Sequence, residues 1–464
     1  TNSLGVFNGQ GLLNLNGTIT IDDVLTQGEI KVSANSAVTN DGGITADIIT
    51  NEGTFTSNSA ITAGITNKGT FTSLAGITGN ISNEGEFTSN GTISGDVTNS
   101  STFNNNGALT GTLTNTGNAT SNASNLLGNV SNDGTLNFAG GTYGDYTISG
   151  IGKTVITVDT ENAGTIVQNG LTVNAEKTFT NTKDITINET LNNLGSINNN
   201  GNFTVNGTNS LGTITGNGTL NAAGTITVNE NVKQGNFVNT GNLIFADENK
   251  TVTSNVINKS DATITAVGSN IVGTINNAGI LNFKGTTNGN IVGYDGSNGV
   301  INLVGDLKVA NEISDNFLNL SDKTLTLTET GSLNLSGLNV NGGKIDAQNG
   351  NIDTIGLGNL VLNSNLNVSI DVALAGDTPS SDSLTAKTIT NSGYKIVIDS
   401  IKIISDPTVG YSPFETTVAD EVLREFVTLS DSAMKVNGVS AGVSYTVSYL
   451  SQTGQLSFSL GNLY

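Results

Sequence analysis

The sequence predicts an all-β protein, a right-handed parallel β-solenoid (a β-helix) that ends in a β-rich C-terminal capping module. Three observations support this fold class. They are a period of 16 residues through residues 49–128, a high content of Thr, Ile, Val and Phe with Gly or Asn every few residues, and a change of composition after about residue 360. A fixed short period is typical of stacked repeats. The right hand is expected because parallel crossovers are almost always right-handed.

The repeat places the same residue type at the same position of successive units. Read in register, the first two units are ITNEGTFTSNSAITAG from Ile49 and ITNKGTFTSLAGITGN from Ile65. Three columns are apolar and are predicted to fill a thin core between three short faces, while a fourth column is asparagine. The columns are Ile49, Ile65, Ile81, Val97 and Leu113; Phe55, Phe71, Phe87 and Phe103; Ile61, Ile77, Ile93 and Leu109; and Asn51, Asn67, Asn83, Asn99 and Asn115.

Each strand alternates, as in Thr54-Phe55-Thr56, where one side chain points inward and its neighbours point outward. The asparagine column has two interpretations that the residues leave open. The side chains form a ladder in which each amide bonds the next, or Asn and Gly only supply turn geometry.

Residues 1–48 are predicted to form an N-terminal cap and the first coils, with alternating runs at Leu12–Leu15, Thr18–Ile21 and Glu29–Val32. Residues 49–360 are predicted to be solenoid repeats, strict to residue 128 and looser afterwards. The looser part keeps the pattern apolar-x-Asn-x-Gly-x-apolar with loops of varied length between copies.

Residues 361–464 are predicted to be a distinct C-terminal β-rich cap, because the apolar runs lengthen there and all three Pro residues lie there. The stretch Glu415–Leu429 is the only plausible helix. Val418, Val422 and Phe426 recur in it at a spacing of four.

Composition limits the partners. The chain has 464 residues, a formal net charge of −21, and no Cys, His or Trp. Because the chain is acidic, we do not expect nucleic acid as a partner. The sequence contains no run of about 18 apolar residues, so no membrane-spanning segment is predicted. Because the chain begins at Thr1 and its only Met is Met434, we expect a processed or excised piece whose signal peptide has been removed.

Residues suited to catalysis form no pattern. Without His there is no Ser-His-Asp triad, and the only Arg is Arg424. Glycan lyases and hydrolases need converging carboxylates, whereas Glu52, Glu84, Glu86 and Asp96 hold outward or turn positions of the repeat. We therefore predict no enzyme activity, no catalytic residues and no cofactor.

Two oxygen-rich loops, Tyr294–Gly299 and Gly376–Ser383, have the composition to hold a calcium ion. The Gly-rich calcium repeat of β-rolls is absent, so ordinary loops are favoured and no metal site is predicted. Pairs such as Thr54 and Thr56 also suggest an outward threonine ladder of the ice-binding kind. That column breaks at Glu86, and the β-propensity of Thr explains it better.

Asn-x-Gly turns between short strands, as in ITNEGTFT and INNAGILNF, recur along the chain. The stretch Leu366–Ile404 then runs as an alternating strand ending near an Asp, the segment Asp382-Ser383-Leu384, and a Gly before an Ile-rich strand. These features resemble the passenger domain of bacterial type V autotransporters and related surface adhesins. The resemblance implies a β-solenoid exported by an outer-membrane translocator, with residues 366–464 as a terminal cap or autochaperone-like folding nucleus.

The predicted function is that of an extracellular, non-enzymatic structural or adhesive rod, displayed at or released from a bacterial cell surface. Its expected partners are glycans or proteins on host or neighbouring cells, contacted through many weak interactions. The alternative is a subunit of an extracellular filament or sheath, in which copies of the chain join end to end by strand pairing.

Overall fold

The computed structural model describes residues 2–408 and 412–461, and the chain is all-β, with 61% of residues in strands. The described residues contain no α-helix, only four single-turn 3₁₀ helices. These are η1 (Ala123–Asn125), η2 (Gly268–Asn270), η3 (Arg424–Phe426) and η4 (Asp431–Ala433). None of the described residues forms a helix long and apolar enough to cross a membrane.

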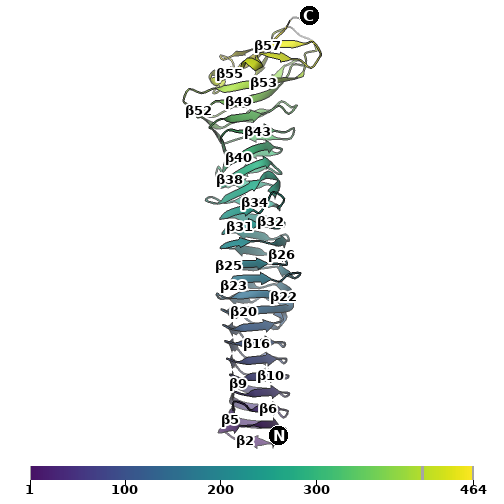
Figure 1. Ribbon diagram of the computed structural model, residues 1–464, viewed down its shortest axis with the longest axis vertical. Helices are drawn as coiled ribbons and strands as arrows, with labels where there is room; N and C mark the ends of the chain where they lie inside the picture. Colours follow the sequence, from purple (N-terminus) through teal and green to yellow (C-terminus); the bar gives the residue numbers. More distant parts are fainter. Residues whose placement is uncertain (1, 409–411, 462–464) are drawn as a thin grey trace. The chain divides into compact units, whose positions relative to one another are not determined.

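The chain folds into two compact units. The first comprises Thr1–Ile226 with Glu230–Gly235, and the second comprises Thr227–Asn229 with Asn236–Tyr464. Both are built from parallel strands stacked turn upon turn (Figure 1), and together they contain about 20 turns of a β-solenoid. The predicted division at residues 48 and 360 stays a prediction about sequence organisation.

The strands of the first unit are short and follow each other closely. They are β1 (Asn2–Leu4), β2 (Phe7–Asn8), β3 (Leu12–Leu15), β4 (Thr18–Ile21), β5 (Leu25–Val32), β6 (Ala37–Asn40), β7 (Ile44–Asn51), β8 (Thr54–Ser57), β9 (Ile61–Asn67), β10 (Thr70–Ser73), β11 (Ile77–Thr78), β12 (Ile81–Asn83), β13 (Glu86–Ser89), β14 (Ile93–Ser94), β15 (Val97–Asn99), β16 (Thr102–Asn105), β17 (Leu113–Asn115), β18 (Asn118–Ser121), β19 (Val130–Asn132), β20 (Thr135–Tyr143), β21 (Thr147–Ser149), β22 (Lys153–Asn162), β23 (Thr165–Val173), β24 (Thr178–Asn181), β25 (Asp184–Asn193), β26 (Ser196–Asn199), β27 (Asn202–Val205), β28 (Thr208–Ser210), β29 (Thr213–Thr215) and β30 (Thr219–Ala222). Strands β31 (Thr225–Val228) and β32 (Val232–Asn239) contribute residues to both units.

The 16-residue period sets the strand register. Strand β10 pairs in parallel with β8 and with β13, so that Phe71 lies between Phe55 and Phe87. Strand β12 likewise places Ile81 between Ile65 and Val97. The predicted parallel stacking is therefore confirmed. In the N-terminal region, the strands expected at Leu12–Leu15 and Thr18–Ile21 are β3 and β4.

The apolar columns form the core. All four Phe of the second column, and the Ile, Val and Leu members of the other two, are buried. The side chains next to them in each strand are exposed or half-buried, as the pattern exposed–buried–half-buried–buried of β8 shows. Each turn covers the apolar face of the one before it, so a thin core suffices.

The second unit continues the same construction with longer insertions. Its parallel strands are β33 (Asn242–Phe245), β34 (Val252–Asn258), β35 (Thr263–Val267), β36 (Ile271–Val272), β37 (Ile275–Asn277), β38 (Ile280–Thr286), β39 (Ile291–Gly293), β40 (Val300–Val309), β41 (Glu312–Ser314), β42 (Phe317–Leu320), β43 (Lys323–Leu327), β44 (Ser332–Asn334), β45 (Gly337–Val340), β46 (Gly343–Asp346), β47 (Thr354–Gly356), β48 (Asn359–Leu362), β49 (Leu366–Ala373), β51 (Ser383–Thr385), β52 (Thr388–Asn391), β53 (Ile396–Ser405) and β55 (Val427–Leu429). The two-residue β50 (Ser380–Ser381) pairs antiparallel with β49.

A four-stranded antiparallel sheet closes the second unit, in the order β54 (Phe414–Thr417), β58 (Gln455–Leu460), β57 (Ser444–Leu450), β56 (Lys435–Asn437). The helix predicted over Glu415–Leu429 is wrong: this stretch contains most of β54, a turn, η3 and β55. The main chain of β54 pairs with β58, and Val418 donates to Gly454 O. Tertiary strand pairing thus overrides the local spacing of four.

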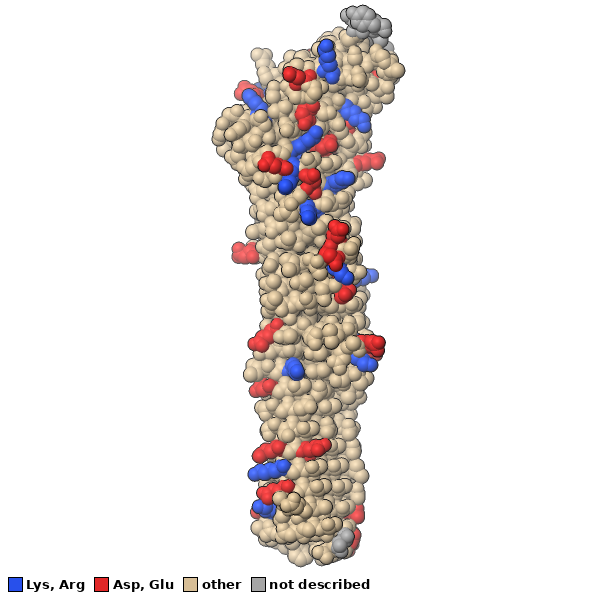
Figure 2. All heavy atoms as spheres, viewed as in Figure 1, with Lys and Arg blue, Asp and Glu red and all other residues tan. Residues whose placement is uncertain are grey.

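Charged side chains are sparse on the surface. Figure 2 shows acidic and basic side chains interspersed, and the described residues on the face shown form no continuous patch of one sign. On this face the charges therefore do not gather at one place.

Candidate functional site

The predicted asparagine column is an internal ladder of side-chain amides. In each of four successive steps one Asn Nδ2 donates to the Oδ1 of the Asn in the next turn, at 2.7–2.8 Å, and all five side chains are buried. The same Nδ2 also donates to backbone carbonyl groups, one in its own turn and one in the next. Asn67, for example, donates to Gly69 O at 3.1 Å and to Glu86 O at 2.9 Å. The two interpretations therefore coexist, because one amide both closes its turn and bonds the next rung.

The ladder continues to Asn132 and then meets a turn without an amide. Strand register places Gly150 above Asn132 and Gln168 above Gly150. Gln168 spans the gap, since its Oε1 accepts from Asn132 Nδ2 at 2.6 Å while its Nε2 donates to Asn132 O and Gly150 O. The extra methylene of Gln supplies the reach that an Asn lacks.

A second ladder uses the same construction in another corner of the first unit. Asn162, Asn181 and Asn199 bond in series at 2.8–2.9 Å. Gly216 then takes the rung position, and Gln234 bridges back to Asn199 at 2.7 Å. The sequence analysis missed both Gln residues. The signal that identifies them is a Gly where the pattern has Asn, followed one turn later by Gln.

The second unit has a third ladder of the same kind. Asn239, Asn258 and Asn277 bond in series at 2.8–2.9 Å. Gly293 pairs with Asn277 in the next turn, and Asn277 donates across it to Asn316 Oδ1 at 2.9 Å. Hydrogen bonds between buried side-chain amides thus connect successive turns in both units.

The phenylalanine column stacks at the spacing of the strands. The rings of Phe55, Phe71 and Phe87 lie 4.7 Å apart and within 6° of parallel. Phe103 is tilted by 54° from Phe87, and the next rung after it is Ala119. These buried ladder and stack residues connect successive turns of the solenoid.

A concavity lies in the first unit, over β20, β22, β23 and β25. Its volume is about 690 Å³, and we call it the groove. Gly134, Gly152 and Gly170 are among the residues that line it. The polar and apolar side chains that line it are Asp133, Thr135, Ile151, Lys153, Asn169, Leu171, Thr172, Glu189, Thr190, Leu191 and Asn192.

The groove offers mixed chemistry on four successive turns. Ile151 is 70% exposed, which is an unusual position for a large aliphatic side chain. Asp133 Oδ1 accepts the Ile151 N–H at 3.0 Å, so the apolar side chain is held in place beside a carboxylate. Lys153 and Glu189 add one charge of each sign. Hydroxyls, amides and an exposed aliphatic group together suit a polar ligand that also has apolar patches.

Two carboxyl groups in the second unit are fully buried. Asp371, in β49, and Asp382, just before β51, are both 0% exposed. Burial raises the pKa of Asp382 to about 7 and also raises the pKa of Asp371. Both residues belong to the stretch 366–404 that carries the family resemblance. Sequence analysis noted the Asp-Ser-Leu segment but did not predict that these two side chains meet.

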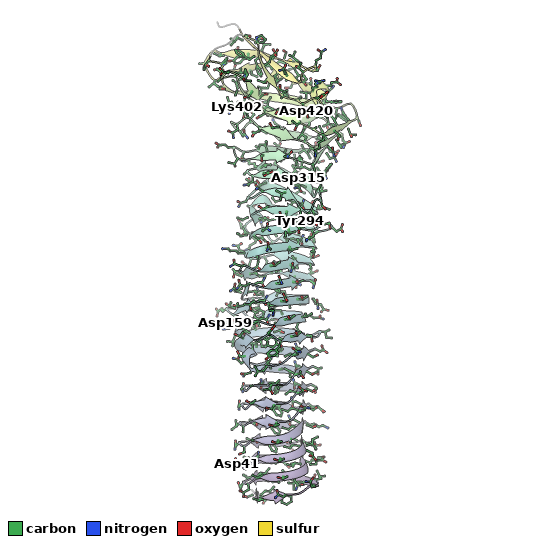
Figure 3. The ribbon with its side chains drawn as sticks, turned by 180° about the vertical axis from the view of Figure 1, so that it is seen from behind. Asp41, Asp159, Tyr294, Asp315, Lys402 and Asp420 are labelled. Atoms are coloured by element: carbon green, nitrogen blue, oxygen red, sulfur yellow. The ribbon has the colours of Figure 1, made fainter. Side chains whose placement is uncertain are left out.

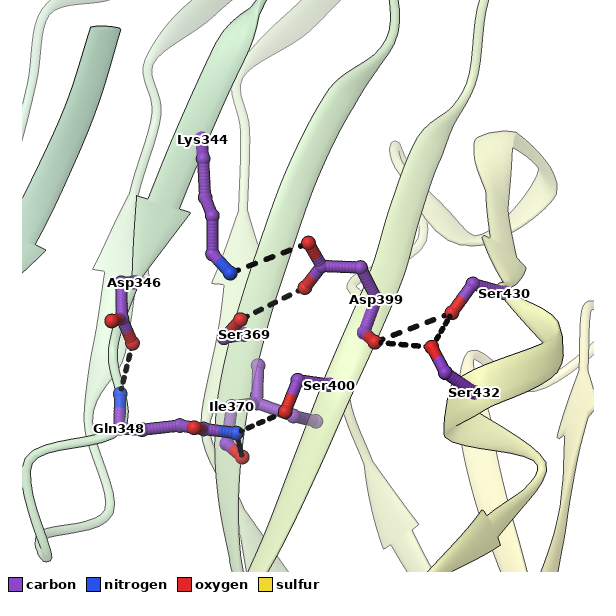
Figure 4. A network of polar contacts seen from close by, with 9 residues as sticks. All are labelled: Lys344, Asp346, Gln348, Ser369, Ile370, Asp399, Ser400, Ser430 and Ser432. Carbon is purple, nitrogen blue, oxygen red and sulfur yellow. Dashed lines mark hydrogen bonds and ion pairs between the residues drawn. The ribbon is translucent and has the colours of Figure 1, made fainter.

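A second polar network lies close by (Figure 4). The Asp399 carboxylate accepts from Ser369 Oγ at 2.8 Å and lies 3.3 Å from Lys344 Nζ. The Asp399 carbonyl accepts from the hydroxyls of Ser430 and Ser432. This network connects β46, β49 and β53 to η4, and so fastens the end of the parallel stack.

Other carboxylates of the first unit lie on different turns. Figure 3 shows Asp41 and Asp159 on separate turns of the first unit. Glu84, Glu86 and Asp96 are exposed. Bonds from the Thr112 N–H and hydroxyl lower the pKa of Asp96, which is therefore a charged turn residue.

The two oxygen-rich loops considered for calcium use their polar groups in other contacts. Tyr294 OH accepts from Lys259 Nζ at 3.1 Å, and Asp382 is occupied by backbone N–H groups. Within residues 2–408 and 412–461, no group of three His, Cys, Asp or Glu side chains is placed to hold a metal ion.

Comparison with family models gives no match for this chain, and comparison with curated proteins gives none either. The fold defines the class to which the chain belongs: it is a parallel β-solenoid repeat protein, stitched by buried amide ladders.

Proposed function

We propose that this chain is an extracellular, non-enzymatic adhesive or structural rod, displayed at or released from a bacterial cell surface. The observation that supports this most is the outer face of the strict repeat. Stacked in register, Thr54 and Thr70 and their neighbours present hydroxyls and amides turn after turn. Such a face suits many weak contacts made in parallel. The resemblance of residues 366–404 to autotransporter passengers supports export through an outer-membrane translocator.

The groove is the place where a specific ligand would bind such a rod. We propose that it takes a segment of a cell-surface glycan. Its hydroxyl, amide and carboxylate groups match the hydroxyls of a sugar, and the exposed Ile151 matches the apolar face of a sugar ring. Because it is open along its length, it suits a chain rather than a small free molecule.

A glycan array probed with the whole chain tests this proposal. We expect binding to a restricted set of glycans, and a loss of about tenfold or more in Asn192→Ala and in Lys153→Ala, since about 1.4 kcal/mol of lost contact is a factor of ten. Thr72→Ala, on the flat face of the repeat, is the matched control. Absence of binding to any glycan or bacterial or host cell surface contradicts the adhesive function. Equal losses in all three variants contradict the groove as its site.

One observation favours the alternative, a subunit of an extracellular filament or sheath. Val6 is 70% exposed and Phe7 is 44% exposed. Exposed apolar side chains that lie next to each other suit contact with a second copy.

Electron microscopy over a range of concentrations separates the two functions. Filaments that grow with concentration and disappear in Phe7→Asp support the filament subunit. Particles of one length at every concentration argue against it.

A further inference from the structure

The two buried Asp residues of the second unit are hydrogen-bonded neighbours beside a short antiparallel strand pair. Asp382 N donates to Asp371 O at 2.9 Å, and Asp371 N donates to Asp382 Oδ2 at 2.7 Å. This pairing holds β49 and the segment after β50 together. Both side chains are therefore fixed in position by the backbone that carries them.

Both carboxyl groups also accept hydrogen bonds from the turn of residues 347–353, which connects β46 to β47. Asp371 Oδ2 accepts from Asn349 N at 2.8 Å and from Gly350 N at 2.7 Å. Asp382 Oδ1 accepts from Asp353 N at 2.7 Å. Three N–H groups of one turn thus depend on two acidic side chains from elsewhere in the chain.

The charge around the pair is unfavourable for two ionised groups. Asp371 Oδ1 is buried and has no hydrogen-bond partner. The other charged groups that act on the two residues are Asp353, in the turn, and Lys402, which pairs with Asp371 in the register of β49 and β53. Burial is the main cause that opposes ionisation of each carboxyl. Asp353 also opposes ionisation of both, and Asp371 opposes that of Asp382, whereas the exposed Lys402 favours ionisation of Asp371 and there outweighs Asp353.

We propose that Asp371 and Asp382 form a proton-holding clasp, which keeps the turn 347–353 closed on β49 while the pair retains one proton and loosens it when that proton leaves. This inference does not depend on the proposed function. It assigns a pH-sensitive opening to the region that closes the parallel stack.

The direction of the pH effect follows from proton binding. The folded pair retains its proton up to about pH 7, whereas an exposed Asp releases its proton near pH 3.8. Between these values the closed form binds more protons than the open form, so raising the pH favours opening. One proton changes the opening constant about tenfold per pH unit. Above about pH 7 the effect levels off, because the closed form has also lost its proton.

Hydrogen exchange on the whole chain tests the clasp. The amides to follow are those of Asn349, Gly350 and Asp353, which donate to the two carboxyl groups. After correction for the intrinsic pH dependence of exchange, we expect their opening constant to rise about tenfold per unit between pH 5 and 7 and to level off above pH 8. In Asp382→Asn, which removes one of the two titrating carboxyl groups, we expect the slope with pH to become smaller.

The control is Asp346→Asn, on the strand that leads into the same turn. Asp346 Oδ1 accepts from Gln348 N, and an Asn can still do so, so the slope of the natural chain should persist. A natural chain with no slope between pH 5 and 7, or an unchanged slope in Asp382→Asn, would overturn the proposal. If Asp382→Asn does not fold, the slope of the natural chain and that of Asp371→Asn decide the question.

Discussion

Shortening Gln168 by one methylene tests whether the amide ladders stabilise the solenoid. In Gln168→Asn the side chain no longer spans the turn of Gly150 to reach Asn132. Three buried hydrogen bonds are lost, one from Asn132 Nδ2 and two from Gln168 Nε2. A net bond contributes about 1 kcal/mol, and an unsatisfied buried group costs about 1–3 kcal/mol. We therefore expect a local destabilisation on the order of 3–5 kcal/mol.

The assay must be local, because each turn of a solenoid is stabilised mainly by its neighbours. Hydrogen exchange in β19, β21 and β23 should accelerate by about a hundredfold to a thousandfold, at about 1.4 kcal/mol per factor of ten. Exchange in β8 and β10 should not change. Gln10→Asn is the matched control, since Gln10 is exposed.

A second variant distinguishes the bridge from a simple loss of volume. Adding Gly150→Asn to Gln168→Asn gives every rung of the ladder an Asn in the sequence. It should not restore stability, because Gly150 has φ of 112° and an added Cβ would lie 2.4 Å from Asn132 O. A change below about threefold in Gln168→Asn, or full rescue by the second substitution, would refute the reasoning.

Two further changes test the core and the closing sheet. Phe71→Ala removes a buried ring stacked at 4.7 Å on both Phe55 and Phe87, so we expect a local loss of stability of about 3–5 kcal/mol. Hydrogen exchange of β8–β13 measures this loss, and Thr72→Ala, the control, should change it little. At Asp406 partial burial opposes ionisation, but hydrogen bonds from the turn 438–440 and a Tyr hydroxyl outweigh it and hold the pKa below its usual value. The folded chain thus binds fewer protons there. Its stabilisation is present above pH 3.8 and is lost as the pH falls through the folded pKa. Exchange of the 438–440 amides should accelerate in acid, and Asp406→Asn should show the faster rate already at pH 7.

The sequence alone determined the repeating part of the fold. A period of 16 with fixed Ile, Phe and Asn positions dictates which residues stack, because any other register would expose the apolar columns to water. The Asn ladder and the Phe stack follow from the same register.

Only the tertiary structure decided what happens where the period breaks. The sequence marks the break, with Gly150 at the Asn position and Gln168 one turn later. That Gln168 bonds Asn132, 36 positions away, is decided only by the stacking of the turns. The meeting of Asp371 and Asp382 depends in the same way on strand pairing and on a turn from another part of the chain. The spacing of four in Glu415–Leu429 led to the wrong prediction of a helix, because hydrogen bonds to β58 outweigh the local helical periodicity. Short-range patterns specify a solenoid because each rung contacts only its neighbours. Its interruptions are specified by long-range hydrogen bonds whose partners become known only once the chain is folded.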